Sequence, residues 1–187
     1  MNKLKIILAL MLFSTIKVKA TGQLSPWATH LSPLVAAVVN TKGPVMELGC
    51  GHYSTPILHT LCFPSKRKLL SIESNQKWIS SFIYLESDWH KFLYVPQVSG
   101  WDSVGENERW AVVFVDHAPA GRRKIDIQRL RNNVDIFVVH DSETIHDNIY
   151  DMEHILSSFK YRYNYVIYKT QTTLVSDIIN VREFFDI

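Results

Sequence analysis

Cysteine is scarce in this chain of 187 residues, with only Cys50 and Cys62 present. A helix expected over residues 54–62 rises about 1.5 Å per residue, which holds the two thiols more than about 10 Å apart. A disulfide needs Cα atoms within about 7 Å, so we expect the two cysteines to stay unpaired. The fold must therefore be held by a hydrophobic core and not by cross-links.

The chain also lacks an apolar run of the ~20 residues needed to cross a bilayer. Its first residues still differ from the rest, because Lys3 and Lys5 precede a short apolar stretch that ends at Phe13. Small residues around Ala20 then resemble a signal-peptidase site. This pattern predicts a secretory signal peptide over 1–20 and one domain over 21–187. It places the mature protein outside the cell, in the secretory lumen or in a bacterial periplasm. The alternative is an ordinary amphipathic first helix.

A strong excess of charge is missing as well. The formal net charge is +2, from 20 basic and 18 acidic side chains. Cleavage after residue 20 would remove four lysines and no acids, leaving 16 − 18 = −2. The charge therefore gives no indication of a nucleic-acid partner. The local cluster Arg122-Arg123-Lys124 is predicted to be the solvated start of a helix.

Apolar segments alternate with helix-like segments along the rest of the chain. Helices are expected over 26–40, 54–62, 75–86, 122–132 and 146–158, and strands over 45–48, 68–73, 92–95, 110–116 and 134–141. Two further strands, 161–169 and 172–178, are joined by a link too short for a parallel crossover. The pattern predicts an α/β fold, a three-layer Rossmann-like sandwich whose mostly parallel sheet has an antiparallel C-terminal strand pair. The polar segment 96–109 is expected to be a loop over the site.

Polar residues stand at the expected carboxyl ends of several strands. Glu47 is followed by Gly49 and Gly51, two glycines that allow a sharp turn and close approach of a ligand. Glu73 and Asp116 end the next two long strands. Because ligands of open parallel sheets bind at this edge, we expect these residues to share a small-molecule site. Helix capping is the alternative, and we prefer it for Asn75 and Ser142.

These motifs resemble the class I S-adenosylmethionine (SAM)-dependent methyltransferases. Val45–Gly51 is similar to their first motif, Glu73 to the acid that holds the ribose, and Asp116 to the end of their fourth-strand motif. The resemblance covers most of residues 27–180 and implies SAM as cofactor. The cofactor-binding residues that we expect on this basis are Glu47, Gly49, Gly51, Ser54, Glu73 and Asp116.

Methyl transfer is an in-line displacement that needs positioning and a base for the acceptor proton. We expect His117 as the base, with His140 second and Asp116 beside them. No Asn/Asp-Pro-Pro-Tyr-like motif follows the fourth strand, which favours O-methylation of a small-molecule or sugar-like acceptor. Arg122 and Arg123 are suited to an acidic acceptor.

A divalent cation is an alternative within the same class. Related small-molecule enzymes hold it with acids at the ends of the fourth and fifth strands, the places of Asp116 and Asp141 here. Oxygen ligands suit Mg²⁺. Ser142, however, replaces the asparagine of that group, and we assign no metal ligand from the sequence.

Three other functions share features with parts of this pattern. A nicotinamide-dependent enzyme would use Gly49 and Gly51, but Ser54 stands where its fingerprint has a third glycine. A secreted, non-catalytic domain that keeps the fold is a second alternative. A serine hydrolase is set aside, because the chain has no Gly-x-Ser-x-Gly motif.

Overall fold

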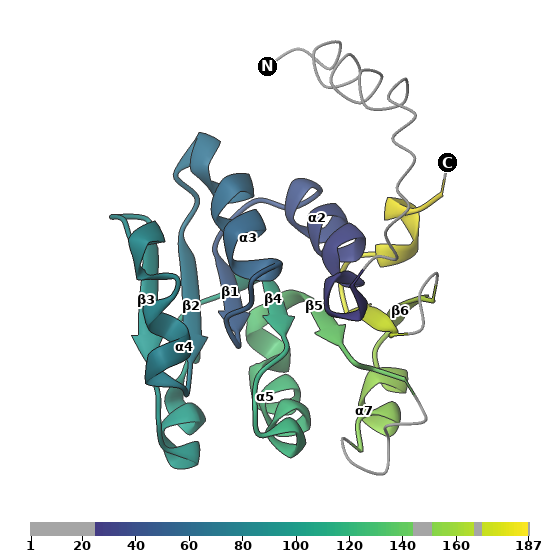
Figure 1. Ribbon diagram of the computed structural model, residues 1–187. Coiled ribbons are helices and arrows are strands. Elements are labelled where there is room, and N and C mark those ends of the chain that lie inside the picture. The colour runs from purple at the N-terminus through teal and green to yellow at the C-terminus, as the bar shows by residue number, and fades with distance from the viewer. Residues whose placement is uncertain (1–24, 144–150, 167–169, 187) are drawn as a thin grey trace.

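The computed structural model describes residues 25–143, 151–166 and 170–186. Its centre is one seven-stranded sheet with the order β3-β2-β1-β4-β5-β7-β6 (Figure 1). The strands are β1 (Val45–Leu48), β2 (Leu69–Glu73), β3 (His90–Tyr94), β4 (Trp110–Val115), β5 (Val134–His140), β6 (Tyr161–Tyr165) and β7 (Thr172–Ser176). Strands β1 to β5 are parallel, whereas β7 pairs antiparallel with both β5 and β6. The predicted fold class is confirmed.

The central strands are buried on both faces, which explains their continuous apolar sequence. Every residue of β1 and β4 is buried, including the polar Glu47. Val115 of β4 lies opposite Val139 of β5. The residues that follow them, Asp116 and His140, therefore emerge side by side at one edge of the sheet.

Helices cover both faces and make the three layers. Their bounds are α2 (Leu31–Val39), α3 (Ser54–Cys62), α4 (Gln76–Ser80), α5 (Arg123–Leu130) and α7 (Glu153–Ser157). Helices α2 and α3 pack Leu34 and Leu58 into one apolar cluster. Helices α5 and α7 pack Ile127 and Leu156 into the cluster on the other face. No helix among the described ranges is both long and apolar enough to span a bilayer.

The observed element bounds differ from the expected ones at a few places. Helix α3 has the predicted bounds, but the predicted helix 75–86 is divided into α4 and a 3₁₀ turn, Ile83–Leu85. The expected loop 96–109 contains a 3₁₀ helix, Val98–Ser103, whose Trp101 is buried in the core. Local apolar periodicity does not show this burial, because the partners of Trp101 are distant in the sequence.

Three predictions fall partly or wholly outside the described residues. They are the expected leader 1–20, the first part of the expected helix 146–158 and the end of the expected strand 161–169. Cys50 and Cys62 are both free, as expected, and both are buried.

Candidate functional site

A cavity of about 700 Å³ opens at the carboxyl edge of the parallel strands. Its volume is in the range of small-molecule and cofactor sites. The walls come from the turn after β1, the start of α3, the end of β4, helix α4 and the segment before α2. The lining residues are Trp27, His30, Cys50, Gly51, His52, Tyr53, Ser54, Trp78 and Asp116. Of the predicted cofactor residues, the structure brings Gly51, Ser54 and Asp116 to this cavity.

The turn after β1 passes very close to the end of β4. Gly49 has φ +93°, and a Cβ placed on it would lie 2.7 Å from the carbonyl oxygen of Asp116. Both the conformation and the space therefore require glycine at this position. Gly49 shapes the floor of the site and is not among the residues that line it.

Glu47 is completely buried below this turn. Its carboxylate accepts hydrogen bonds from the hydroxyl groups of Ser71, at 2.6 Å, and Thr55, at 3.0 Å. Burial raises the pKa of Glu47 to about 7, although these hydroxyl donors act in the opposite direction. Glu47 thus joins β1 to β2 and to the first turn of α3 and is not a lining residue.

A hydrogen-bonded chain leads from Glu47 toward the outer surface. Because Ser71 donates its one proton to Glu47, the Nε2 of His90, at 3.0 Å, must donate to Ser71. The Nδ1 of His90 then accepts from the Nδ1 of His59, also at 3.0 Å. Burial lowers the pKa of His90 to about 3, which keeps this imidazole neutral.

Glu73 braces the glycine turn from the neighbouring strand. One carboxylate oxygen accepts from the backbone N–H of Cys50 at 3.1 Å, and the other accepts from the N–H groups of Ser74 and Asn75 at 2.8 Å. Asn75 itself caps α4 through its side chain, as we preferred from the sequence. Glu73 does not line the cavity, so its contact with a ribose remains a prediction.

The start of α3 forms one wall of the cavity. Its N-cap residue, Tyr53, provides no side-chain hydrogen bond to the helix. The first N–H groups of a helix attract anions, and here they adjoin the cavity through Tyr53 and Ser54. Trp78 stands opposite and donates from Nε1 to the carbonyl oxygen of Cys50 at 2.6 Å. The arrangement suits a ligand that has a carboxylate and a flat aromatic group.

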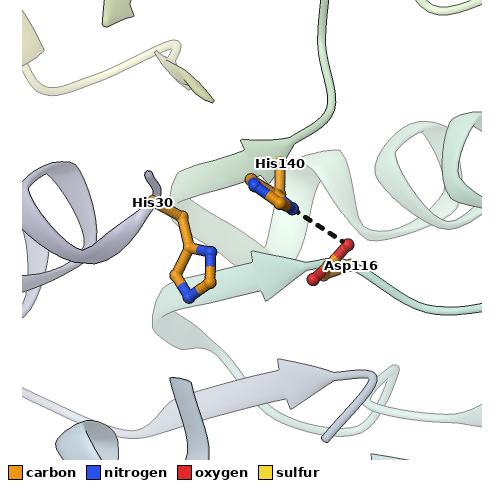
Figure 2. A group of neighbouring side chains, drawn as sticks. All are labelled: His30, Asp116 and His140. Atoms are coloured by element: carbon orange, nitrogen blue, oxygen red, sulfur yellow. Dashed lines mark ion pairs between the residues drawn. The ribbon is translucent and has the colours of Figure 1, made fainter. Parts of the chain in front are cut away.

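Asp116 lies at the boundary between the cavity and a group of histidines. His140 Nδ1 is 3.3 Å from Asp116 Oδ1, and His30 from the start of α2 approaches the same pair (Figure 2). The ligand atoms of His30, Asp116 and His140 all lie within 4.8 Å of one another. Sequence reasoning missed His30, because it lies before the first strand and its position depends on how α2 packs.

Burial and neighbouring charges together shift the pKa values of His30, His140 and Asp116. Burial lowers the pKa of His30 to about 3, and the nearby His140 adds to the effect. Burial also acts to lower the pKa of His140, but Asp116 outweighs it and raises the pKa above its usual value. Burial acts to raise the pKa of Asp116, but His140 and Arg123 outweigh it and keep the carboxyl ionised.

His117 does not line the cavity and is 2 % exposed. Its Nε2 lies 2.9 Å from Asp126 Oδ2, and its ring stacks on Trp101 at 4.6 Å between centroids. Burial lowers the pKa of His117 despite the carboxylate beside it. The structure therefore does not bring the expected base to the cavity, and segment 96–109, which was expected over the site, covers His117 instead.

The predicted solvated cluster at the start of α5 is wrong for two of its three residues. Arg122 and Arg123 are buried, because carboxylates of this chain surround them. Arg122 pairs with Asp126 and Asp102. Arg123 spans Asp116 and Asp141, which places a cation between the two acids that a magnesium site would need. These partners also take the guanidinium groups that were expected for an acidic acceptor.

Comparisons with known proteins give matches among solved structures. TomG, an O-methyltransferase from Streptomyces achromogenes in complex with SAM, has a TM-score of 0.58 and 14% identity, over 94% of this chain and 99% of its own. The methyltransferase PaMTH1 from Podospora anserina, bound to S-adenosylhomocysteine (SAH), has a TM-score of 0.60 and 11% identity, with coverages of 94% and 97%. Human methyltransferase-like protein 13 in complex with SAH has a TM-score of 0.58 and 14% identity, over 80% of this chain and 82% of its own.

The chain has the methyltransferase fold. No protein-family model matches the sequence, and no curated protein matches it. At these identities the likeness concerns the fold alone. The antiparallel end of the sheet belongs to this likeness and distinguishes the methyltransferase fold from the 3-2-1-4-5-6 order of dinucleotide-binding domains.

Proposed function

We propose that this protein is a SAM-dependent methyltransferase that acts on a small-molecule or sugar-like acceptor, with O-methylation as the favoured reaction. The observation that carries the proposal is the cavity at the end of β1 and β4, inside a fold shared with proteins bound to SAM or SAH. Its walls offer the groups that this cofactor requires.

The donor would lie across the glycine turn. The N–H groups at the start of α3 would receive its carboxylate, and Gly51 leaves room for its chain. Aromatic side chains of Trp78 and Tyr53 provide apolar area for the adenine. Glu73, whose carboxylate accepts from three backbone N–H groups beside the glycine turn, would also accept from a ribose hydroxyl.

The acceptor would lie on the opposite side, next to His30 and Asp116. Asp116 is the acidic side chain in the cavity wall, and a hydroxyl group of the acceptor would donate to it. In the transfer the acceptor hydroxyl would give its proton to the Asp116 carboxylate and its oxygen would bond to the methyl carbon, while the carbon–sulfur bond breaks and its electrons return to sulfur to give SAH. Positioning of the two reactants supplies most of the catalysis.

Thermal unfolding with added ligand tests the proposal. A ligand at 100 times its dissociation constant stabilises the folded state by about 2.7 kcal/mol. SAM and SAH should therefore raise the unfolding temperature, and NAD⁺ at the same concentrations should leave it unchanged. Stabilisation by NAD⁺ alone would overturn the donor assignment. Binding of SAM without SAH production across acceptor classes would favour the non-catalytic alternative.

We also propose export with removal of residues 1–20, on the leader pattern of the sequence. N-terminal sequencing of the protein recovered from its producing cells tests this. Recovery of a chain that begins at Met1 and stays in the cytosol would contradict it.

A further inference from the structure

His30 is a buried histidine whose two ring nitrogens make no hydrogen bond within the described part of the fold. The side chain is 3 % exposed, and neither nitrogen has a hydrogen-bond partner among the described residues. A buried polar group left in this way costs about 1–3 kcal/mol. The ring packs edge-on to His140 with centroids 4.7 Å apart, and it lines the cavity. The unpartnered nitrogens of His30 therefore indicate that a bound ligand or ion is their partner.

The ring of His140 is oriented by a hydrogen bond at one of its two nitrogens, as is typical of histidines that bind a metal. Its Nε2 lies 3.1 Å from the hydroxyl of Thr29, which fixes the ring from behind. Its Nδ1 is buried and faces the carboxylates of Asp116, at 3.3 Å, and Asp141, at 3.5 Å. A histidine that binds a metal through one nitrogen almost always uses the other in a hydrogen bond of this kind.

Asp116 completes the group with a fixed carboxylate. Arg123 donates to its Oδ1 at 2.9 Å, which orients the group and keeps it charged. The register of β4 and β5 sets Asp116 beside His140, and His30, at the start of α2, lies to one side of this pair (Figure 2).

We propose that His30, Asp116 and His140 bind one divalent transition-metal ion at the wall of the cavity. Metal–nitrogen bonds of about 2.0–2.1 Å require ligand atoms closer together than 4.8 Å, so side-chain movements of about an ångström would close the group on an ion. Two imidazoles and one carboxylate favour Zn²⁺ or Fe²⁺ over Mg²⁺ or Ca²⁺. This set differs from the acidic pair Asp116 and Asp141, which Arg123 spans.

The site would keep a coordination position open toward the cavity, because His30 and Asp116 both line it. Three protein ligands and an open position are typical of catalytic and not of structural zinc. An oxygen atom of a bound ligand would take that position. The link to an acceptor hydroxyl rests on the proposed function, whereas the binding of the ion does not.

Titration of the untagged, chelator-treated full chain with Zn²⁺, without SAM, tests the site. We expect one ion per chain, with Mg²⁺ failing to compete. The His30→Gln and His140→Gln variants should each bind Zn²⁺ at least tenfold more weakly. His59→Gln is the matched control, because it alters the other close histidine pair, His59 and His90, and should bind as the wild type does.

A second measurement on the wild type does not depend on the variants folding. Zn²⁺ should shift the imidazole ¹⁵N resonances of His30 and His140 and leave those of His59 and His90 unchanged. Failure of the wild type to bind Zn²⁺ would overturn the site, as would equal binding by His30→Gln or shifts confined to other histidines. Because SAM binding is measured separately on the metal-free chain, a failure here leaves the methyltransferase proposal standing.

Discussion

The imidazole of His117 lies flat against the indole of Trp101, with centroids 4.6 Å apart and planes 12° from parallel. Asp126 accepts a hydrogen bond from Nε2 of the same ring at 2.9 Å. The histidine that follows the fourth strand therefore joins that strand to α5 and to the 3₁₀ helix Val98–Ser103. We propose a structural role for it in place of the expected catalytic one.

Replacement of His117 by alanine should lower the free energy of unfolding by about 2–4 kcal/mol, because it removes the stacked ring and one partner of Asp126. Donor affinity, measured by titration with SAH under conditions where the variant is folded, should not change. A variant with wild-type stability and lost methyl transfer would show instead that His117 acts in the reaction.

Glycine is required where the first turn meets the end of β4. Gly49→Ala would force an alanine into φ +93° and against the carbonyl oxygen of Asp116, so we expect a loss of about 2–4 kcal/mol in chemical unfolding. Gly121→Ala is the matched control, because a Cβ there meets no atom within 4 Å, and it should stay within about 0.5 kcal/mol. Equal stability of the two variants would contradict the described turn.

Glu47 should make stability depend on pH. Its folded pKa of about 7 exceeds the ordinary value of 4.5, so the folded state keeps this proton over a range where the unfolded chain has lost it. The stabilisation is present below about pH 4.5 and is lost as the pH rises to about 7, by about 3 kcal/mol in all. Between about pH 4.5 and pH 7, the difference in unfolding free energy between the wild type and Glu47→Gln should therefore change by about 3 kcal/mol. A difference that is constant with pH would contradict a raised pKa.

Substitution of Arg123 should lower the stability of the fold more than substitution of most other side chains near the site. Its guanidinium donates to Asp116 and to the carbonyl oxygens of His117 and His140. Arg123→Met would leave the partly buried Asp116 carboxylate without its cation and two carbonyl oxygens without a donor, so we expect a loss of about 2–4 kcal/mol. Chemical unfolding measures the loss, with Lys124→Met, at the half-buried neighbouring position, as a control that should change little because Lys124 pairs with the exposed Asp151.

The arrangement of the sheet could be predicted because β1, β4 and β5 are continuous apolar runs and the last two strands have too short a link for a crossover. The glycine turn and the polar strand ends followed from the same reasoning. The contacts of those ends could not be predicted, since they depend on residues distant in the sequence. Glu47 and Glu73 are turned to hydroxyl and N–H groups of their own fold.

The histidine group shows the same limit. Asp116 and His140 follow adjacent strands, so their proximity could be foreseen from the topology. His30 enters from a helix before the sheet begins, and no spacing in the sequence relates residue 30 to residue 116. Most partners of Arg122 and Arg123 could not be predicted either, because Asp102, Asp116 and Asp141 lie on other segments of the chain. Asp126, four residues after Arg122 on α5, is the exception.

Isothermal titration of SAH into the full chain tests the central claim most directly. We expect one site in the wild type, and loss of that binding in Gly51→Val, whose side chain would project at the cavity wall beside Ser54. Circular dichroism should show the variant folded, because Gly51 has no positive φ and the nearest atom to its Cβ is the movable hydroxyl of Ser54. Absence of SAH binding by the folded wild type, or equal affinity in the two proteins, would contradict a donor site at the end of β1.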